Sequence, residues 1–235
     1  MPTILALETS SDACSVALLN DKGVFEETII SPREHTQRLL PMVEGILKAQ
    51  NTALADVDGI AYGAGPGSFT GLRICLSVAQ GLAYGVACPL IAVSSLLAMA
   101  ATACRNQTFD TGSIIIPVID ARMDEVYWSA YRLEQSGQLT PLVDQSVSAP
   151  ELCAEFVNSV SSHNVVAMGN GWQYEALSTL ANANLDAYPS AHDIALIGSA
   201  QFAAGELVNP LDASPTYLRN EVSWKKRERI RSSKQ

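Results

Sequence analysis

The sequence predicts an α/β fold built from two similar halves. Short apolar runs rich in strand-forming residues alternate with longer runs whose apolar residues recur at helical spacing. The order of elements at the start of the chain is repeated from about residue 114 onward, as an internal duplication would produce. The chain has 235 residues, of which 48% are hydrophobic and 17% are charged, so it can build a substantial core. We therefore expect two mixed sheets flanked by helices.

The first half opens with three strands and continues with a helix. Thr3–Leu7, Cys14–Leu19 and Val24–Ile30 are separated by polar turns, which predicts an antiparallel meander. Ser31-Pro32-Arg33-Glu34 then combines a Ser cap, a Pro at the first helical position and a Glu at the third, which is a capping box. We expect Pro41 to kink or restart the helix, because it lacks a backbone donor.

Two strand–helix units complete this half. A strand at Ile60–Tyr62 leads through a glycine-rich loop, Gly63–Gly71, into a helix over residues 72–85. A strand at Pro89–Val93 is followed by a helix over residues 95–104, which Ser94 caps. Three strands, then helix, strand, helix, strand and helix, form the ribonuclease-H-like half of the actin-like/sugar-kinase (ASKHA) architecture.

The second half repeats the opening. Strands are predicted at 114–119, 125–133, 142–147 and 165–168, and helices at 150–159, 172–180 and 191–207. The last helix is strongly apolar and needs a larger surface than a small second half offers, so we expect it to return to the first half. The predicted domains are residues 1–107, completed by a helix at 191–208, and residues 108–190, followed by a basic tail at 212–235.

Composition excludes several classes of protein. Because the formal net charge is -9, we do not expect this chain alone to bind nucleic acid through a broad positively charged surface. The five cysteines are dispersed without a C-x-x-C pair, which indicates free thiols in a reducing compartment. Residues 1–8 have no basic segment before the apolar run, and no run reaches the ~18 apolar residues of a membrane helix. We expect a cytoplasmic protein without a membrane anchor.

The C-terminal tail concentrates basic charge. Tyr217-Leu218-Arg219-Asn220 is followed by Trp224-Lys225-Lys226-Arg227 in an otherwise acidic protein. Such a run is either a solvated tail or a basic arm with an aromatic anchor that contacts RNA or a protein partner.

The glycine-rich loop has two interpretations. Glycines between a strand and a helix let the backbone approach a bulky group, and the helix start offers free amides to an anion. No Gly-Lys-Ser/Thr follows, so the loop is not a Walker sequence, and the glycines are equally typical of tight turns and close packing. A nucleotide site or interface here would use the loop and the carboxylates at two matching strand ends: Glu8, Gly65, Gly67, Ser68, Thr70, Asp120 and Arg122. A lone carboxylate at a strand end is more often a turn or cap residue.

The helix after this loop carries a ridge of small residues. Ser77, Gly81 and Gly85 recur every four residues, so another helix can approach closely along that line. The partner is either the first helix of the same domain or a helix of another molecule, in a bundle formed with the Leu39/Met42/Val43/Ile46 stripe.

The sequence lacks the usual catalytic patterns. It has three histidines, His35, His163 and His192, with no H-E-x-x-H or other clustered metal set. It also lacks a G-x-S-x-G elbow and an evident nucleophile–base pair. These absences argue against a peptidase and predict no metal site.

Four motifs together resemble the TsaB family, also called YeaZ, over essentially the whole chain. They are Pro32–Arg38, Gly65–Arg73, Asp120–Arg122 and Glu125–Trp128, and the tail residues Tyr217–Asn220 and Trp224–Lys226 fit the gamma-proteobacterial branch. The resemblance implies a role in forming threonylcarbamoyladenosine at position 37 of tRNAs that read codons starting with A. It also implies a two-domain actin-like fold and a non-catalytic subunit that binds TsaD, the catalytic subunit, and TsaE, an ATPase.

The resemblance implies which residues contact partner proteins and which histidine-containing motifs of TsaD this chain lacks. It implies a homodimer when the chain is alone, a heterodimer with TsaD, and ATP used by the complex while this chain binds no cofactor itself. The contact helices begin near Ser31 and Gly71, which gives the candidates His35, Arg38, Leu39, Met42, Val43, Ile46, Gly71, Ile74, Val78, Gly81 and Leu82. TsaD has a His-x-x-x-His pair where this chain reads Ser94–Met99, and a Ser-Gly-Gly-His loop where it reads Asp120–Met123.

Two hypotheses follow. The first is a non-catalytic scaffold subunit that stabilises TsaD through a helix–helix surface. The alternative is an independent nucleotide-binding enzyme or phosphotransferase of the ASKHA class, in which the glycine-rich loop and Glu8 or Asp120 surround ATP and magnesium.

Overall fold

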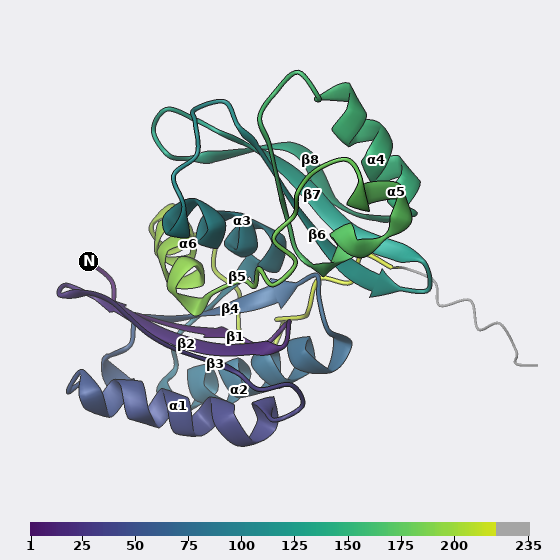
Figure 1. Cartoon of the computed structure of the whole chain (residues 1–235). Coiled ribbons are helices and arrows are strands. Elements are labelled where there is room, and N and C mark those ends of the chain that lie inside the picture. Colours follow the sequence, from purple (N-terminus) through teal and green to yellow (C-terminus); the bar gives the residue numbers. More distant parts are fainter. Residues whose placement is uncertain (220–235) are drawn as a thin grey trace, which may run out of the picture.

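The computed structural model describes residues 1–219 as two mixed sheets with helices on their faces (Figure 1). The first sheet has the order β3-β2-β1-β4-β5. β1 pairs antiparallel with β2 and β2 with β3, whereas β4 lies parallel to both β1 and β5. The predicted meander is confirmed. The strands are β1 (Ile4–Glu8), β2 (Ala13–Asn20), β3 (Gly23–Ile30), β4 (Gly59–Gly65) and β5 (Leu90–Ser94).

Alternation along the central strand places helices on both faces of this sheet. Leu5 and Leu7 of β1 point into a core shared with α1 (His35–Ala49) and α2 (Phe69–Val86). Ile4 and Ala6 point to the other face, where α3 (Ser95–Asn106) and α6 (Ala191–Ala204) pack. A short helical turn, η1 (Leu54–Asp56), precedes β4. Two buried faces explain why β1 is apolar throughout.

The second sheet repeats the first pattern with four strands. Its order is β8-β7-β6-β9, with β6–β7 and β7–β8 antiparallel and β9 parallel to β6. This repetition confirms the predicted actin-like/sugar-kinase class with two ribonuclease-H-like halves. The elements are β6 (Ile114–Arg122), β7 (Glu125–Leu133), β8 (Leu139–Ser148), α4 (Pro150–Ser159), β9 (Val165–Met168), η2 (Asn170–Gln173) and α5 (Glu175–Ser178).

The helix α6 comes late in the chain but packs on the first sheet. Ala191, Ile194 and Ala195 are fully buried there, and Gly198 faces Ala61 so closely that a Cβ would lie 2.7 Å from the Ala61 Cβ. The helix ends at Ala204, three residues earlier than predicted, because Gly205 adopts a left-handed conformation. Val208 then forms an antiparallel bridge with Leu90 at the end of β5.

The predicted capping box at Ser31 is wrong. Arg33 has φ +70°, which no helical residue adopts, and α1 begins only at His35. The Ser31 amide donates to the carbonyl of Asp12 at 3.1 Å, and the Glu34 carboxylate pairs with Arg38 at 2.9 Å. The Ser31 amide and the Glu34 carboxylate therefore have other partners, and the Ser31 hydroxyl has no hydrogen-bond partner among the described residues. α1 then continues through Pro41 without a restart.

Two further boundaries differ from the prediction. β4 extends to Gly65 and α2 begins at Phe69, so the glycine-rich loop between them is only three residues long. The predicted helix at 172–180 is instead the turn η2 followed by the single-turn α5. Trp172, whose Nε1 donates to the Ile116 carbonyl at 3.0 Å, is buried beneath β6, and this contact fixes the irregular backbone.

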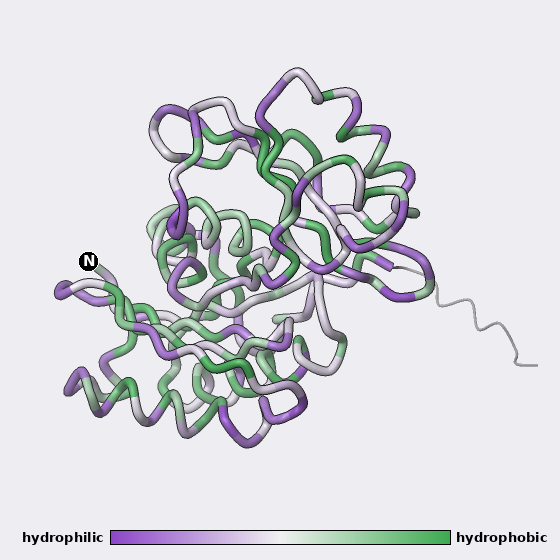
Figure 2. The backbone as a smooth tube through the Cα atoms, viewed as in Figure 1, coloured by the Kyte–Doolittle hydropathy of each residue, from purple (hydrophilic) through white to green (hydrophobic). Residues whose placement is uncertain are grey.

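Hydropathy follows the layers. Figure 2 shows that hydrophobic residues concentrate along the strands and the inward sides of the helices, while the peripheral turns are hydrophilic. Within residues 1–219, no helix combines the length and the apolar character needed to cross a lipid bilayer.

Candidate functional site

The carboxyl group of Glu8 is sealed inside the protein at the end of β1. Its side chain is fully buried, and Oε1 accepts a hydrogen bond from the Ser10 amide while Oε2 accepts one from the Ser95 hydroxyl at 3.3 Å. Burial raises the pKa of Glu8 to about 7, although the hydrogen bonds from Ser10 and Ser95 oppose the rise. A group with no access to solvent cannot reach a nucleotide, so Glu8 holds β1 to the start of α3.

The glycine-rich loop packs against its own chain. A Cβ on Gly67 would lie 2.6 Å from the carbonyl oxygen of Ser10, and one on Gly71 would collide with the Thr9 carbonyl. The Ser68 amide donates to the Ser10 carbonyl at 2.8 Å, and the Thr9 hydroxyl donates to the Gly71 carbonyl at 2.8 Å. The glycines therefore serve close packing within the chain, which favours that interpretation of the loop, and nucleotide binding by the loop stays a prediction.

The remaining loop candidates do not converge on this point. Gly65, in a left-handed conformation at φ +107°, packs against Leu72, and the Ser68 hydroxyl caps α2 by accepting from the Gly71 amide at 3.3 Å. Thr70 is exposed on the first turn of α2.

Asp120 stabilises a turn, as a lone carboxylate at a strand end commonly does. Its Oδ1 accepts from the Arg122 amide at 2.8 Å and from the Tyr174 hydroxyl at 2.9 Å. Arg122, Met123 and Asp124 all have φ near +60°, so the β6–β7 hairpin turns through three left-handed residues. Across residues 1–219, no group of three or more His, Cys, Asp or Glu side chains could hold a metal ion.

The apolar stripe of α1 is core rather than contact surface. Leu39, Met42, Val43 and Ile46 are at most 5% exposed and pack against the first sheet. His35 is buried too, with Nε2 3.2 Å from the carbonyl oxygen of Ala13. The prediction that this stripe pairs with another molecule is wrong, because the stripe covers the chain's own sheet.

The α2 ridge, formed by Ser77, Gly81 and Gly85, faces outward. All three residues are exposed, and a Cβ added at Gly81 or Gly85 would meet no described atom within 4 Å. The interpretation in which α1 covers this ridge is therefore wrong for residues 1–219. Along the same helix, Ile74, Val78 and Leu82 are only partly buried against the core.

An apolar groove of about 400 Å³ adjoins the α2 ridge at the start of α2. It is lined by Thr36, Phe69, Thr70, Arg73, Ile74, Ser77 and Val78. The candidate Arg38 is exposed on α1, where it pairs with Glu34, whereas Gly71 is buried beneath the Thr9 carbonyl.

An aromatic cluster at the end of this groove was not predicted from the sequence. The Arg73 guanidinium lies 3.7 Å above the centre of the Phe69 ring, and its Nε donates to the Tyr217 hydroxyl at 3.2 Å. The rings of Phe69 and Tyr217 are 5.9 Å apart. Phe69 is 57% exposed and Tyr217 is 45% exposed, so the cluster is presented at the surface. Tyr217, an aromatic residue in the basic tail, was the one feature of the sequence that could have indicated this cluster.

The segment that leads to Tyr217 is bound to both halves. The side-chain amide of Gln80 in α2 donates to the Pro210 carbonyl at 2.7 Å, and the Thr216 backbone amide donates to the Ala64 carbonyl at 2.8 Å. The Arg219 guanidinium then forms an ion pair with Glu125 and donates to the Ala121 carbonyl at 3.3 Å. The solvated-tail interpretation is wrong up to Arg219, while Trp224 and the basic residues beyond it lie outside the described part of the chain.

Comparison with known proteins places these features in a family. The family model for TsaD, described as tRNA N6-adenosine threonylcarbamoyltransferase, matches residues 23–183. The protein named tRNA threonylcarbamoyladenosine biosynthesis protein TsaB from Escherichia coli (strain K12) is 42% identical over 95% of this chain and 97% of its own length. The protein of the same name from Haemophilus influenzae is 37% identical over 95% of this chain and 96% of its length.

Solved structures agree with the sequence relatives. The structure of YeaZ from Pseudomonas aeruginosa is 38% identical and superposes with a TM-score of 0.80 over 93% of this chain and all of that one. A second structure, described as an uncharacterized protein with similarity to peptidase YEAZ from Pseudomonas aeruginosa, is 39% identical with a TM-score of 0.84 over the same shares. Identity at this level across nearly the full length establishes that the chain belongs to the TsaB (YeaZ) family of tRNA threonylcarbamoyladenosine biosynthesis proteins.

Proposed function

We propose that this chain is a non-catalytic subunit needed for N6-threonylcarbamoylation of adenosine 37 in tRNAs that read codons starting with A. It binds and activates TsaD, acts with TsaE in the cytoplasm, and contacts tRNA through the complex. The names of its relatives support the pathway. The proposal of a non-catalytic role rests on the candidate ligands, since Glu8 is sealed from solvent and Asp120 is held in a turn.

The observation that carries the proposal is the exposed α2 ridge beside an apolar groove. Small residues spaced one helical turn apart allow a second helix to approach to within van der Waals contact of the backbone. The exposed aromatic and arginine side chains at the end of the groove are of the types that contribute most to binding at protein interfaces. The docking surface is therefore α2 and the aromatic cluster, with Thr36 at its α1 side.

Co-purification with TsaD tests this assignment. Gly81→Leu places a large side chain where the isolated chain has open space, so it should leave the fold intact and reduce TsaD binding by at least about 100-fold. Asn158→Leu, at an exposed position of α4, is the matched control and should bind normally. The same Gly81 variant should convert a homodimer of the isolated chain into a monomer in light scattering. Normal TsaD binding by Gly81→Leu would show that docking uses another surface.

Calorimetry distinguishes the alternative of an independent nucleotide-binding enzyme. We expect no saturable binding of ATP with magnesium to the isolated chain, with ATP being used only by the complex. Micromolar ATP binding by the purified chain would favour the alternative.

A further inference from the structure

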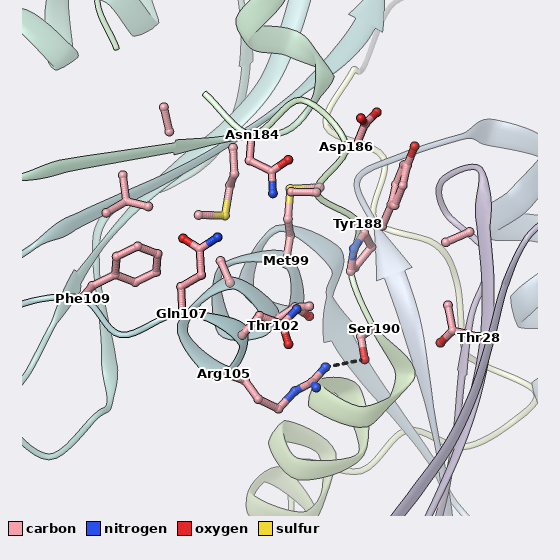
Figure 3. Close-up of a pocket in the computed structure, with 18 of the residues that line it drawn as sticks. Thr28, Met99, Thr102, Arg105, Gln107, Phe109, Asn184, Asp186, Tyr188 and Ser190 are labelled. Carbon is pink, nitrogen blue, oxygen red and sulfur yellow. Dashed lines mark hydrogen bonds between the residues drawn. The ribbon is translucent and has the colours of Figure 1, made fainter. Parts of the chain in front are cut away.

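A second site candidate lies between the two halves, away from the docking surface. A cavity of about 580 Å³ opens between α3 and β3 of the first half and β9 and the 182–190 segment of the second (Figure 3). None of its described lining residues belongs to α1 or α2. Its volume falls within the range of small-molecule pockets, which commonly form between domains.

One wall of this cavity is apolar. Met99 and Ala103 of α3, Phe109 of the following loop, and Val166 and Met168 of β9 contribute to it. In Figure 3 the Phe109 ring lies at one end of the space and Tyr188 at the other. A flat apolar ligand could be covered on one face by such a wall.

The charges around the cavity disfavour a phosphate. Arg105 is the one cationic side chain among its described lining residues, and it is already engaged by the Asp193 carboxylate at 2.9 Å and the Ser190 hydroxyl at 3.2 Å. Glu26 and Asp186 add negative charge to the lining. With its cation neutralised and two carboxylates nearby, the cavity favours a ligand without negative charge.

Two amide side chains define the hydrogen-bonding pattern. Gln107 at the end of α3 and Asn184 of the 182–190 segment extend toward each other across the cavity beside Phe109 (Figure 3). Both are exposed rather than packed into the protein, and each offers a donor and an acceptor. Asn and Gln amides pair in this way with the donor–acceptor edge of a nucleobase.

We infer that this cavity binds the uncharged nucleobase of a free nucleoside. The base packs against the apolar wall by Phe109, and its polar edge bonds to Gln107 and Asn184. The inference is independent of the proposed function, because the docking surface and this cavity share no residue.

Titration of the full chain with nucleosides tests the inference. Adenosine, guanosine, cytidine and uridine are compared by calorimetry, and we expect saturable binding of at least one of them below about 1 mM. Gln107→Ala and Asn184→Ala should each weaken that binding roughly tenfold, since each removes an amide that hydrogen-bonds the base. Gln138→Ala, an exposed glutamine in the β7–β8 turn, is the matched control and should bind like the wild type.

Phosphorylated ligands define the opposing outcomes. Adenosine monophosphate and a single-stranded oligonucleotide both carry phosphates, so each should bind no tighter than the nucleoside. The inference is overturned if no nucleoside binds, if the two amide variants bind the nucleoside normally, or if adenosine monophosphate or the oligonucleotide binds tighter than adenosine.

Discussion

The carboxyl group of Glu8 lies directly against the backbone of Gly63, in the space that any other residue would fill with its Cβ. A Cβ at position 63 would lie 2.7 Å from Cδ of Glu8. The two residues are at the carboxyl ends of β1 and β4, which are parallel neighbours in the first sheet. The absence of a side chain on one strand thus makes room for the buried carboxyl on the other.

Gly63→Ala should therefore destabilise the fold. Its methyl group must displace a buried side chain, and we expect a loss of about 2 kcal/mol in the free energy of unfolding by urea denaturation. Gly45→Ala in α1 is the matched control, because its Cβ would meet only the Glu27 carboxylate at an ordinary 3.7 Å. The control should be neutral or stabilising, since alanine favours helix.

A double variant separates this collision from a general intolerance at position 63. In a Glu8→Ala background the added methyl group has room, so the cost of Gly63→Ala should fall to less than half. An unchanged cost would contradict the proposed contact.

Glu8 should also make stability depend on pH. Its pKa is about 7 in the folded chain against 4.5 when exposed, so between these values only the folded state holds the proton. Stability is then highest below pH 4.5 as far as this group is concerned, falls as pH rises, and carries the full cost of a buried charge above pH 7. The shift corresponds to about 3 kcal/mol.

Glu8→Gln tests the pH dependence without changing the shape of the side chain. The amide oxygen can accept from Ser10 and its NH₂ can donate to Ser95, so the variant should be at least as stable as the wild type at pH 8. Urea denaturation at pH 5 and pH 8 should show a smaller difference for the variant. Equal pH dependence in both proteins would rule out Glu8 as the source.

Arg219 should hold the β6–β7 hairpin in place. Its guanidinium contacts Glu125 and the carbonyl groups of Ala121 and Arg122, so Arg219→Ala should increase hydrogen exchange of the hairpin amides at least about tenfold. Arg132→Ala, an exposed arginine on β7, is the control and should leave exchange unchanged. Faster exchange in both variants would indicate a general effect of lost charge.

The same hairpin offers a stabilising substitution. Met123 and Asp124 form a two-residue turn with φ +59° at both positions, a conformation that costs energy for residues other than glycine. Relief of this strain, about 1–2 kcal/mol, exceeds the unfolded-chain entropy that glycine adds, so Asp124→Gly should raise the free energy of unfolding by about 0.5 to 1 kcal/mol. A loss of stability would indicate that the Asp124 carboxylate makes a compensating contact.

Local sequence patterns determined most of the elements. The alternation in residues 3–30 and the helical spacing after it act within a few residues, and Ser94 caps α3 through the Leu97 amide at 3.2 Å as predicted. The predicted capping box at Ser31 did not form, because the Ser31 amide donates instead to the carbonyl of Asp12 in a distant turn. The sequence motifs also identified the family, because a motif is recognised from its residue types alone, whether or not those residues bind a ligand.

Only the tertiary structure decided which surfaces are open. Helical spacing shows that α1 and α2 each have an apolar stripe, but not that the α1 stripe covers the sheet while the α2 ridge faces outward. It likewise could not place Tyr217 on Arg73, 144 positions earlier, or bury Glu8 against Gly63. Such contacts depend on how separate elements pack, and the periodicity within one element carries no information about what lies against it.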